Sequence, residues 1–524
     1  MVGAGRDGES TGGQARPGDD ELRRVVDLTM RVWYALTPEQ ARSTYATLLR
    51  APTDVIASDP YLLNAYLLSG HLAEHPATEP DQHALVEMSA QMTGLMGETL
   101  KRAGTADEIV MMGSALLIGC RVQGDLDASE RAGDAIQQRL DELARQGRMV
   151  SPRSSSRPGM LTMQRGLTAT LQGDFGRAMR LCSSAYGQMG EPPYRHFAGA
   201  NAAANAAMLS VLEGHVELAR MWLGRLEAFS DRSSWYSYLT YLGEYVARAM
   251  LATDRLDRPT AEAALEMAGP QSAQAELWPF IAVARNTAEL AFGDPVLAHE
   301  QLRAAAFAHN HRLSDSTYCG HILLRAYLNT LVAQGECATA VRLAEKAGDP
   351  PRTLVPVARA CLRTGRYEDA SRLAVQGIRS DDQAVRDIRE LRLIRSVALL
   401  RAGRSEEAAQ VFAVFHRTDD EFTAAMRARI GPQDLADLTS LIDGVDPASP
   451  GPVRDGPDAV AASLTTAEMH VLNLLADGRT IAQVAEASFT SPNTVKTHVS
   501  AIYRKLGVTK RADALWKAEQ LGLL

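Results

Sequence analysis

The 524-residue chain has few cysteines, and only 6% of its residues are aromatic. The five cysteines are Cys120, Cys182, Cys319, Cys337 and Cys361. Their odd number and the absence of a Cys-x-x-Cys pair exclude a disulfide framework and a structural zinc site, and predict reduced, mostly buried thiols. His309 and His311 stand two residues apart on an expected helix and point to different faces. No metal site and no cofactor are therefore expected.

Long hydrophobic runs are also absent. No stretch of 18 apolar residues occurs, and the N-terminus lacks the apolar core of a signal peptide, so we expect a cytoplasmic protein that does not enter a membrane. Residues 1–20 are rich in Gly, Asp and Arg and are predicted to be disordered. Between residues 21 and 442, β-branched runs are almost absent and good helix formers dominate. This region is predicted to be entirely helical.

A Gly-x-x-x-x-Ala pattern recurs within the helical region. The six matches are Gly173/Ala178, Gly214/Ala219, Gly293/Ala298, Gly335/Ala340, Gly365/Ala370 and Gly403/Ala408. Successive glycines lie 41, 79, 42, 30 and 38 residues apart, and the interval of 79 counts as two periods, with Asp254 where a glycine is expected. A left-handed glycine would close each helical hairpin, and the alanine would let the two backbones approach closely.

Stacked hairpins of about 34 to 45 residues predict an α-solenoid, because no single hairpin can bury its apolar face alone. The turns and the spacing resemble the tetratricopeptide class, although its full consensus is not met. Residues 21–160 are interpreted as degenerate repeats and a cap, including a Pro/Ser/Arg-rich loop at 151–158. Five aromatic residues cluster at Trp235, Tyr236, Tyr238, Tyr241 and Tyr245. We interpret them as core between repeats in preference to a ligand-stacking face.

Residues 443–462 contain four prolines and three glycines, which predicts a flexible linker. The following segment, 463–524, carries start and stop signals for four helices. Thr465 with Glu468 and Thr480 with Gln483 form capping boxes, and Ser491-Pro492 opens a third, longer helix that ends near Gly507. A fourth helix is expected from about Thr509. A short second helix, a tight turn and a longer third helix are typical of a helix-turn-helix.

The third helix, the predicted recognition helix at 492–506, has two faces. Val495, Val499, Ile502 and Leu506 follow a helical period and should face the domain core. The opposite face carries Asn493, Lys496, Thr497, Ser500 and Arg504. Polar groups at this spacing suit base edges and phosphates in a major groove. Residues 463–524 hold seven Lys or Arg against five acids, whereas the whole chain has a net charge of -8. The positive charge is therefore concentrated in the segment expected to meet DNA.

Four motifs carry a family resemblance: Leu464-Thr-Thr-Ala-Glu468, Leu472-x-x-Leu475-Ala-x-Gly478, Ser491-Pro-Asn-Thr-Val-Lys-Thr-His498 and Ile502-Tyr-Arg-Lys-Leu-Gly-Val508. Over residues 463–524 the chain resembles the LuxR/GerE-type (NarL/FixJ) DNA-binding domain. The resemblance implies that Lys496, Thr497 and Ser500 touch bases. It also implies that Thr494, Arg504 and Lys505 hold phosphates, and that the last helix, 511–521, dimerises. Ile481, Ser488 and Ala501 depart from the usual family pattern.

The last helix carries an apolar stripe at Leu515, Ala518 and Leu521, which we expect to pair two copies on DNA. The helical repeats ahead of the domain resemble MalT-like large regulators. No Gly-x4-Gly-Lys-Ser/Thr occurs, so nucleotide-driven switching is not expected.

The sequence therefore predicts an all-α, sequence-specific transcriptional regulator. It would bind double-stranded promoter DNA as a homodimer and respond through its helical repeats to a small-molecule or protein effector, with RNA polymerase as a further candidate partner. The alternative is a helical-repeat scaffold that the DNA-binding domain merely localises. The single Gly-x-Ser-x-Gly match, Gly8 to Gly12, has no strand before it, so no enzymatic activity is expected. The operator, the effector and the sign of regulation are left open.

Overall fold

The computed structural model describes residues 17–32, 37–72, 100, 105–147, 158–190, 195–229, 240–269, 276–309, 317–348, 350–380, 383–417, 421–442, 464, 466–476, 479–487, 490–506, 508, 510–511, 514–515 and 518. The predicted linker at 443–462 and most of the predicted disordered N-terminus lie outside these residues. The first helix already begins at Asp19, inside the segment expected to be disordered. Three acidic residues in its first turn favour a helix start there.

Every regular element in this described part is a helix. The first helices are α1 (Asp19–Val32), α2 (Pro38–Leu49), α3 (Thr53–Ser58), α4 (Pro60–Leu72), α6 (Ala106–Val122), α7 (Leu126–Arg145), α8 (Met160–Gln172) and α9 (Phe175–Gln188). The chain forms two compact units, one containing α1 to α7 and the other beginning within α8. No helix among those described is long and apolar enough to cross a membrane.

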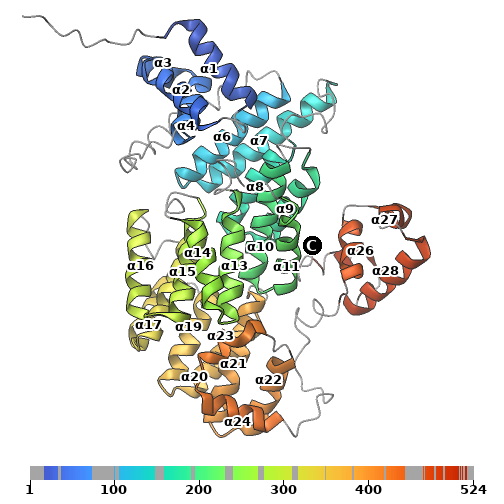
Figure 1. The fold of residues 1–524 in the computed structure, drawn as a ribbon. Helices are drawn as coiled ribbons and strands as arrows, with labels where there is room; N and C mark the ends of the chain where they lie inside the picture. The colour runs from blue at the N-terminus through green and yellow to red at the C-terminus, as the bar shows by residue number, and fades with distance from the viewer. Residues whose placement is uncertain are drawn as a thin grey trace, which may run out of the picture. The chain divides into compact units, whose positions relative to one another are not determined.

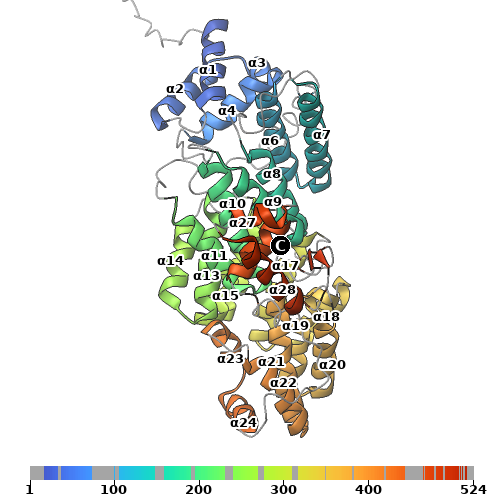
Figure 2. The same ribbon diagram turned by 90° about the vertical axis from the view of Figure 1, so that its right-hand side faces the viewer.

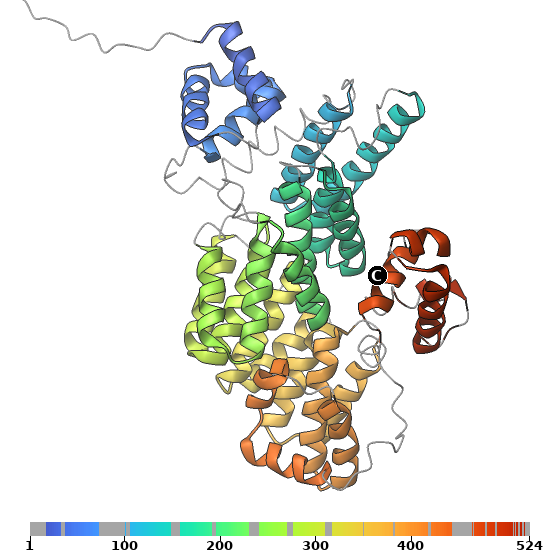
Figure 3. The same ribbon diagram turned by 45° about the vertical axis from the view of Figure 1, so that its right-hand side comes forward.

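The second unit consists mainly of consecutive helical hairpins (Figure 1). They are α10 (Asn201–Glu213) with α11 (Val216–Leu226), α13 (Leu242–Asp254) with α14 (Arg258–Ala268), α15 (Trp278–Phe292) with α16 (Pro295–Ala308), α17 (Tyr318–Ala333) with α18 (Cys337–Ala347), α19 (Pro350–Arg363) with α20 (Tyr367–Ile378), and α21 (Val385–Arg401) with α22 (Ser405–Arg417). A π-helix, η3 (Arg195–Ala200), leads into α10. The first helix of each hairpin packs against its own partner and against the first helix of the next hairpin (Figure 3). This is the packing order of an α-solenoid.

The Gly-x4-Ala pattern predicts these turns correctly. Gly173, Gly214, Gly335, Gly365 and Gly403 all have φ between +75° and +90°. The six alanines of the pattern, Ala178, Ala219, Ala298, Ala340, Ala370 and Ala408, are all fully buried. Gly293 is the exception, because it ends α15 with φ at -121°.

Two further turns lie outside the pattern. In the hairpin of α13 and α14, the left-handed residue is Leu256 (φ 61°) and not Asp254, which corrects the register expected from the sequence. Ala261 follows Leu256 at the usual spacing and is fully buried. Between α6 and α7, Gly124 is left-handed (φ 76°), and the buried residue five positions later is Ser129. The hydroxyl of Ser129 lies 2.8 Å from that of Thr168, so a small polar side chain replaces alanine at this turn.

Three short elements follow α22 and pack back on the hairpins. They are η5 (Glu421–Thr423), α23 (Ala424–Ala428) and α24 (Pro432–Ile442). Both η5 and α23 pack against α13. Phe422 is buried, and the guanidinium groups of Arg220 and Arg255 lie 4.6 and 5.4 Å from the centre of its ring. The segment that precedes the linker is therefore held by residues about 170 to 200 positions upstream.

Two of the five clustered aromatic residues can be placed. Tyr241 and Tyr245 are buried, at 1% and 8% exposure, which fits the interpretation as core. Trp235, Tyr236 and Tyr238 lie outside the described residues. All five cysteines are buried and unlinked, as expected.

Candidate nucleic-acid interface

The C-terminal helices are α26 (Thr466–Ala476), α27 (Ile481–Ala487) and α28 (Pro492–Leu506). They appear in red in Figure 2. Their shared core contains Leu472, Val484, Val495 and Ile502, all of which have no exposed side-chain surface. Three short helices around one apolar centre provide a rigid support for the outer face of α28.

The turn between α27 and α28 forms as the sequence predicts. Thr480 and Gln483 cap α27 reciprocally: the Thr480 amide donates to Gln483 Oε1 at 2.9 Å, and the Gln483 amide donates to Thr480 Oγ1 at 3.4 Å. Ser491 caps α28 by accepting a hydrogen bond from the Thr494 amide at 3.1 Å. The Thr490 amide donates to the Ala485 carbonyl at 3.0 Å and closes the turn between the two helices. Together α27, this turn and α28 form a helix-turn-helix.

The two predicted faces of α28 are both present. Val495, Val499, Ile502 and Leu506 are buried. The exposed residues on the helix are Pro492, Asn493, Thr494, Lys496, Thr497, Ser500 and Arg504. His498 is half-buried between the two faces. The exposed face presents amide, hydroxyl, ammonium and guanidinium groups, which can donate to base acceptors and to phosphate oxygens.

Three of the side chains predicted to contact DNA also bond within the domain. The Thr497 hydroxyl donates to the Asn493 carbonyl at 3.0 Å. The hydroxyl of Thr494 lies 2.9 Å from the Ser491 hydroxyl, so it belongs to the cap of the helix as well as to the exposed face. The Lys505 ammonium donates to Glu468 Oε2 at 2.6 Å and is only 22% exposed. Lys505 thus fixes α28 to α26, a structural task that the sequence pattern does not predict.

Sequence reasoning placed Glu468 in a capping box with Thr465, which lies outside the described residues. It did not predict the contact of Glu468 with Lys505, or the contact of Arg511 with α26. The Glu468 side chain is only 6% exposed and is compensated by Lys505, which is 37 residues away in sequence. Arg511 donates to the Leu475 carbonyl at 2.5 Å and so satisfies a carbonyl at the end of α26. Neither pairing follows a helical period, so no local signal in the sequence could have shown it.

The predicted dimer stripe is only partly available. Ala518 is fully buried in the core of the domain, so it offers no side chain to a second copy. Leu515 is half-buried and packs against the same core. Leu521 lies outside the described residues. The domain therefore covers more of the stripe than its sequence suggests, and Leu515 is the remaining described candidate for a contact with a second copy.

Comparison with known families identifies this domain. Residues 462–518 match the family described as "Bacterial regulatory proteins, luxR family". This finding confirms the resemblance drawn from the C-terminal motifs, and the C-terminal segment is a LuxR-family helix-turn-helix domain. The match does not extend to the helical repeats.

Two curated relatives are similar to a short part of the chain. The chain is 40% identical over 85 residues to the "Probable transcriptional regulatory protein NarL" of two strains of Mycobacterium tuberculosis, CDC 1551 / Oshkosh and ATCC 25618 / H37Rv. The alignment covers 16% of this chain and 38% of each relative.

A solved structure described as "Structure of Naa15/Naa10 bound to HypK-THB" overlaps 93% of this chain and 81% of that chain. Its TM-score is 0.23 and its sequence identity is 12%, too little to support an argument.

Proposed function

We propose that the chain is a sequence-specific transcriptional regulator in which α28 reads the major groove of promoter DNA. The observation that carries this proposal is the exposed polar face of α28, supported on a buried apolar stripe within a LuxR-family domain. A helix presented in this way by a helix-turn-helix fits the width of the major groove of B-DNA.

Within this proposal, the exposed residues divide by the part of DNA that they contact. Lys496, Thr497 and Ser500 are exposed, and the resemblance to the LuxR/GerE-type domain places them where base edges are contacted, so we assign them to the bases. Arg504 contacts a phosphate from the last turn of α28. Asn493 and Thr494 lie in the first turn of the helix, where the positive end of the helix dipole favours an approaching phosphate.

Pairing of two copies is part of the proposal. Helix-turn-helix dimers bind two half-sites one helical turn of DNA apart. Leu515 is half-buried, so part of its side chain can contact a second copy, whereas the side chain of Ala518 is enclosed in the domain core. We assign Leu515 and the segment that follows it to the dimer surface. RNA polymerase is a further partner within this proposal, as expected of a regulator acting at promoters in the cytoplasm.

Control of DNA binding is assigned to residues 21–442. Their stacked hairpins are far larger than a tether requires, and a solenoid offers an extended surface for an effector. The alternative, a scaffold that DNA binding only localises, predicts that no effector changes the affinity for DNA.

The experiment that tests this proposal is selection of duplexes from a random library by the full-length protein. We expect an enriched sequence with two half-sites, and binding that weakens steeply with salt because phosphate contacts release counterions. Leu515→Asp should lower affinity for the full site far more than for one half-site. Enrichment of no sequence over several rounds would contradict the proposal. Equal losses on the full site and the half-site would contradict the assignment of Leu515.

A further inference from the structure

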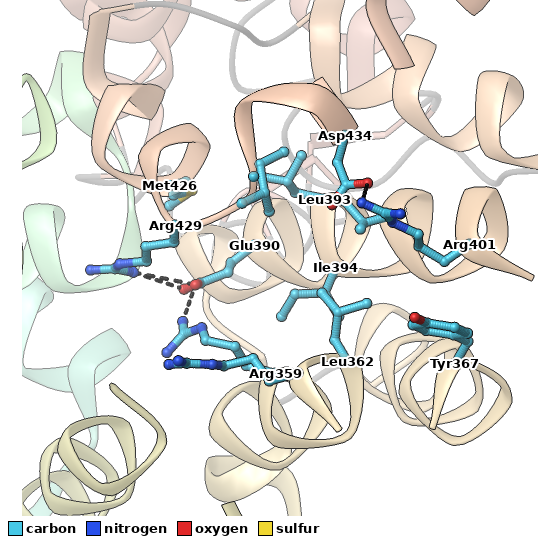
Figure 4. A pocket seen from close by; sticks show the side chains of 14 residues that line it. Arg359, Leu362, Tyr367, Glu390, Leu393, Ile394, Arg401, Met426, Arg429 and Asp434 are labelled. Atoms are coloured by element: carbon cyan, nitrogen blue, oxygen red, sulfur yellow. Dashed lines mark hydrogen bonds and ion pairs between the residues drawn. The ribbon is translucent and has the colours of Figure 1, made fainter. Parts of the chain in front are cut away.

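A cavity of about 260 Å³ lies within the second unit between α19, α21 and the α23–α24 segment (Figure 4). Four arginines and two carboxylates line it, together with apolar side chains. The lining therefore has an excess of positive charge. Its volume suits a small organic molecule and is too small for a folded partner.

One end of the cavity is formed by Arg359, Glu390 and Arg429. Two guanidinium groups converge on the single carboxylate of Glu390 (Figure 4). Arg359 binds it closely and also donates to Asn329 Oδ1 at 2.8 Å, whereas Arg429 Nη1 lies 3.2 and 3.5 Å from the two carboxylate oxygens. Since Glu390 balances only one of the two cations, this end retains a positive charge.

The electrostatics of the cluster agree with this surplus. Burial lowers the pKa of Arg359, the Glu390 carboxylate opposes that change, and the positive charge of Arg429 lowers it further. Burial by itself raises the pKa of Glu390, but Arg359 and Arg429, with Arg325 further away, outweigh it and bring the value to about 2. Glu390 is therefore ionised at neutral pH, and the two arginines still repel each other across it.

Arg429 is the guanidinium best placed to bind an incoming anion. Its side chain is 32% exposed, against 13% for Arg359. Its hydrogen bonds to the described residues use only Nη1, so Nε and Nη2 are available. Two free N–H donors on one guanidinium match the paired oxygens of a carboxylate or a phosphate.

The rest of the cavity is suited to an apolar body. Leu362 and Ile394 lie between the Glu390 cluster and the opposite end (Figure 4). At that end Arg401 Nη2 lies 2.6 Å from Asp434 Oδ1, and the ring of Tyr367 adds an aromatic wall. Arg401 and Asp434 balance each other at this opposite end, so it attracts a ligand's anionic group less than the Arg359–Arg429 end, where two guanidinium groups share one carboxylate.

We propose that this cavity binds a small organic anion, with its carboxylate or phosphate on Arg359 and Arg429 and its apolar body against Leu362 and Ile394. The position of the site suggests a consequence for regulation, which rests on the proposed function. Met426, Arg429 and Asp434 belong to the segment that directly precedes the linker to the DNA-binding domain. An occupant would hold that segment to α19 and α21, and so change the conformations open to the linker.

The test uses the full-length protein and small probes of defined chemistry. Hexanoate and phenyl phosphate carry an anionic group and an apolar body, hexanamide lacks the charge, and inorganic phosphate lacks the body. At about 10 mM, hexanoate or phenyl phosphate should raise Tm by about 1–2 °C for a Kd of about 1 mM. Hexanamide should have no effect. Inorganic phosphate should stabilise less than either amphiphilic probe.

Substitutions at Arg429 separate this site from general anion binding. Arg429→Gln should abolish the shift in Tm, and Arg429→Lys should keep part of it because it keeps the charge. Arg404→Gln is the matched control, because Arg404 is 42% exposed, pairs with Glu407 and does not line the cavity. The same shift in Arg429→Gln as in wild type, or no shift with any probe, would overturn the proposed site. Equal stabilisation by hexanoate and hexanamide would overturn the role of charge.

The regulatory role has a separate readout. The probe that binds should change the affinity for the selected duplex, and the duplex should change the affinity for the probe by the same factor. Binding that depends on Arg429 without such a change would overturn the effector role while leaving the site in place. A protein that binds the probe but no DNA would contradict the proposed function and not the cavity.

Discussion

At the scale of single residues, each side of α28 has a distinct task. Its apolar residues hold the helix in the domain, and its exposed residues are free to meet a ligand. The sequence predicted this division correctly because it depends only on the helical period. It could not predict that Lys505 is bound to Glu468, since that contact depends on how α26 and α28 cross.

Lys496 and Arg504 should behave differently on substitution. Lys496→Ala is expected to cost about 1–3 kcal/mol on the selected duplex and much less on a scrambled one, because a base contact is lost. Arg504→Ala should weaken both duplexes alike, because a phosphate contact carries no sequence information. Fluorescence anisotropy with both duplexes measures the difference. Lys346→Ala, an exposed lysine outside the domain, is the control for charge, and unchanged discrimination in Lys496→Ala would refute the assignment of this residue.

Glu213 in α10 makes stability depend on pH. Burial and the nearby charge of Asp387, partly opposed by Arg325, raise its pKa from 4.5 to about 7. The folded state holds the proton of Glu213 more tightly than the unfolded state does. Glu213 therefore adds stability below pH 4.5, and this added stability is lost as pH rises towards 7. Glu213→Gln should therefore leave stability unchanged near pH 4 and raise it by about 2–3 kcal/mol at pH 8.

Denaturant unfolding of wild type and Glu213→Gln at several pH values measures this effect. The comparison between the two proteins is needed because His215 titrates in the same range with the opposite sign. Burial and the nearby charge of Arg389 lower the pKa of His215 to about 4. A difference in stability that does not vary with pH would show that Glu213 is not the group responsible.

At the scale of elements, the hairpin turn is the repeated unit. The Gly-x4-Ala pattern predicted six left-handed glycines, and five of them have positive φ. The sixth, Gly293, matches the pattern but ends α15 with φ at -121°. The pattern misplaced the turn near Asp254 because Leu256, a residue that rarely adopts positive φ, occupies the left-handed position. It also missed the turn at Gly124, where Ser129 replaces alanine. Both turns thus have the left-handed backbone conformation without the Gly-x4-Ala residues.

Exchanging residues at two turns tests this account. Leu256→Gly should stabilise the protein by about 0.5–1 kcal/mol, because it relieves a left-handed leucine that is 40% exposed. Gly403→Ala should destabilise it by about 1 kcal/mol for backbone reasons alone, since an added Cβ would meet no atom within 4 Å. Thermal unfolding of both variants measures the changes. Destabilisation by Leu256→Gly would mean that the packing of this leucine outweighs its strain.

At the scale of the whole molecule, composition and pattern predicted an all-helical chain with a distinct C-terminal helix-turn-helix. They could not predict contacts that depend on how the hairpins wind. Asp254 and Arg386 form an ion pair although they are 132 residues apart, and η5 and α23 lie against α13. Such pairings follow from small rotations accumulated over several repeats, which no local motif encodes.

Removing residues 21–442 should separate DNA binding from its control. We expect the shortened chain to bind the selected duplex with an affinity that no effector changes, because the surface proposed to sense the effector is gone. Reporter expression under varied growth conditions, compared with that of the full chain, measures the response. Identical regulation by both proteins under every condition would contradict control through the repeats.

The most direct test of the central claim is a genome-wide map of the DNA bound by the full-length protein in cells. The account predicts discrete sites that share one sequence with two half-sites. It also predicts that Lys496→Ala loses or redistributes these sites, while Lys346→Ala keeps them. A map with no discrete sites, or one that is the same for wild type and Lys496→Ala, would contradict the claim that α28 reads promoter DNA.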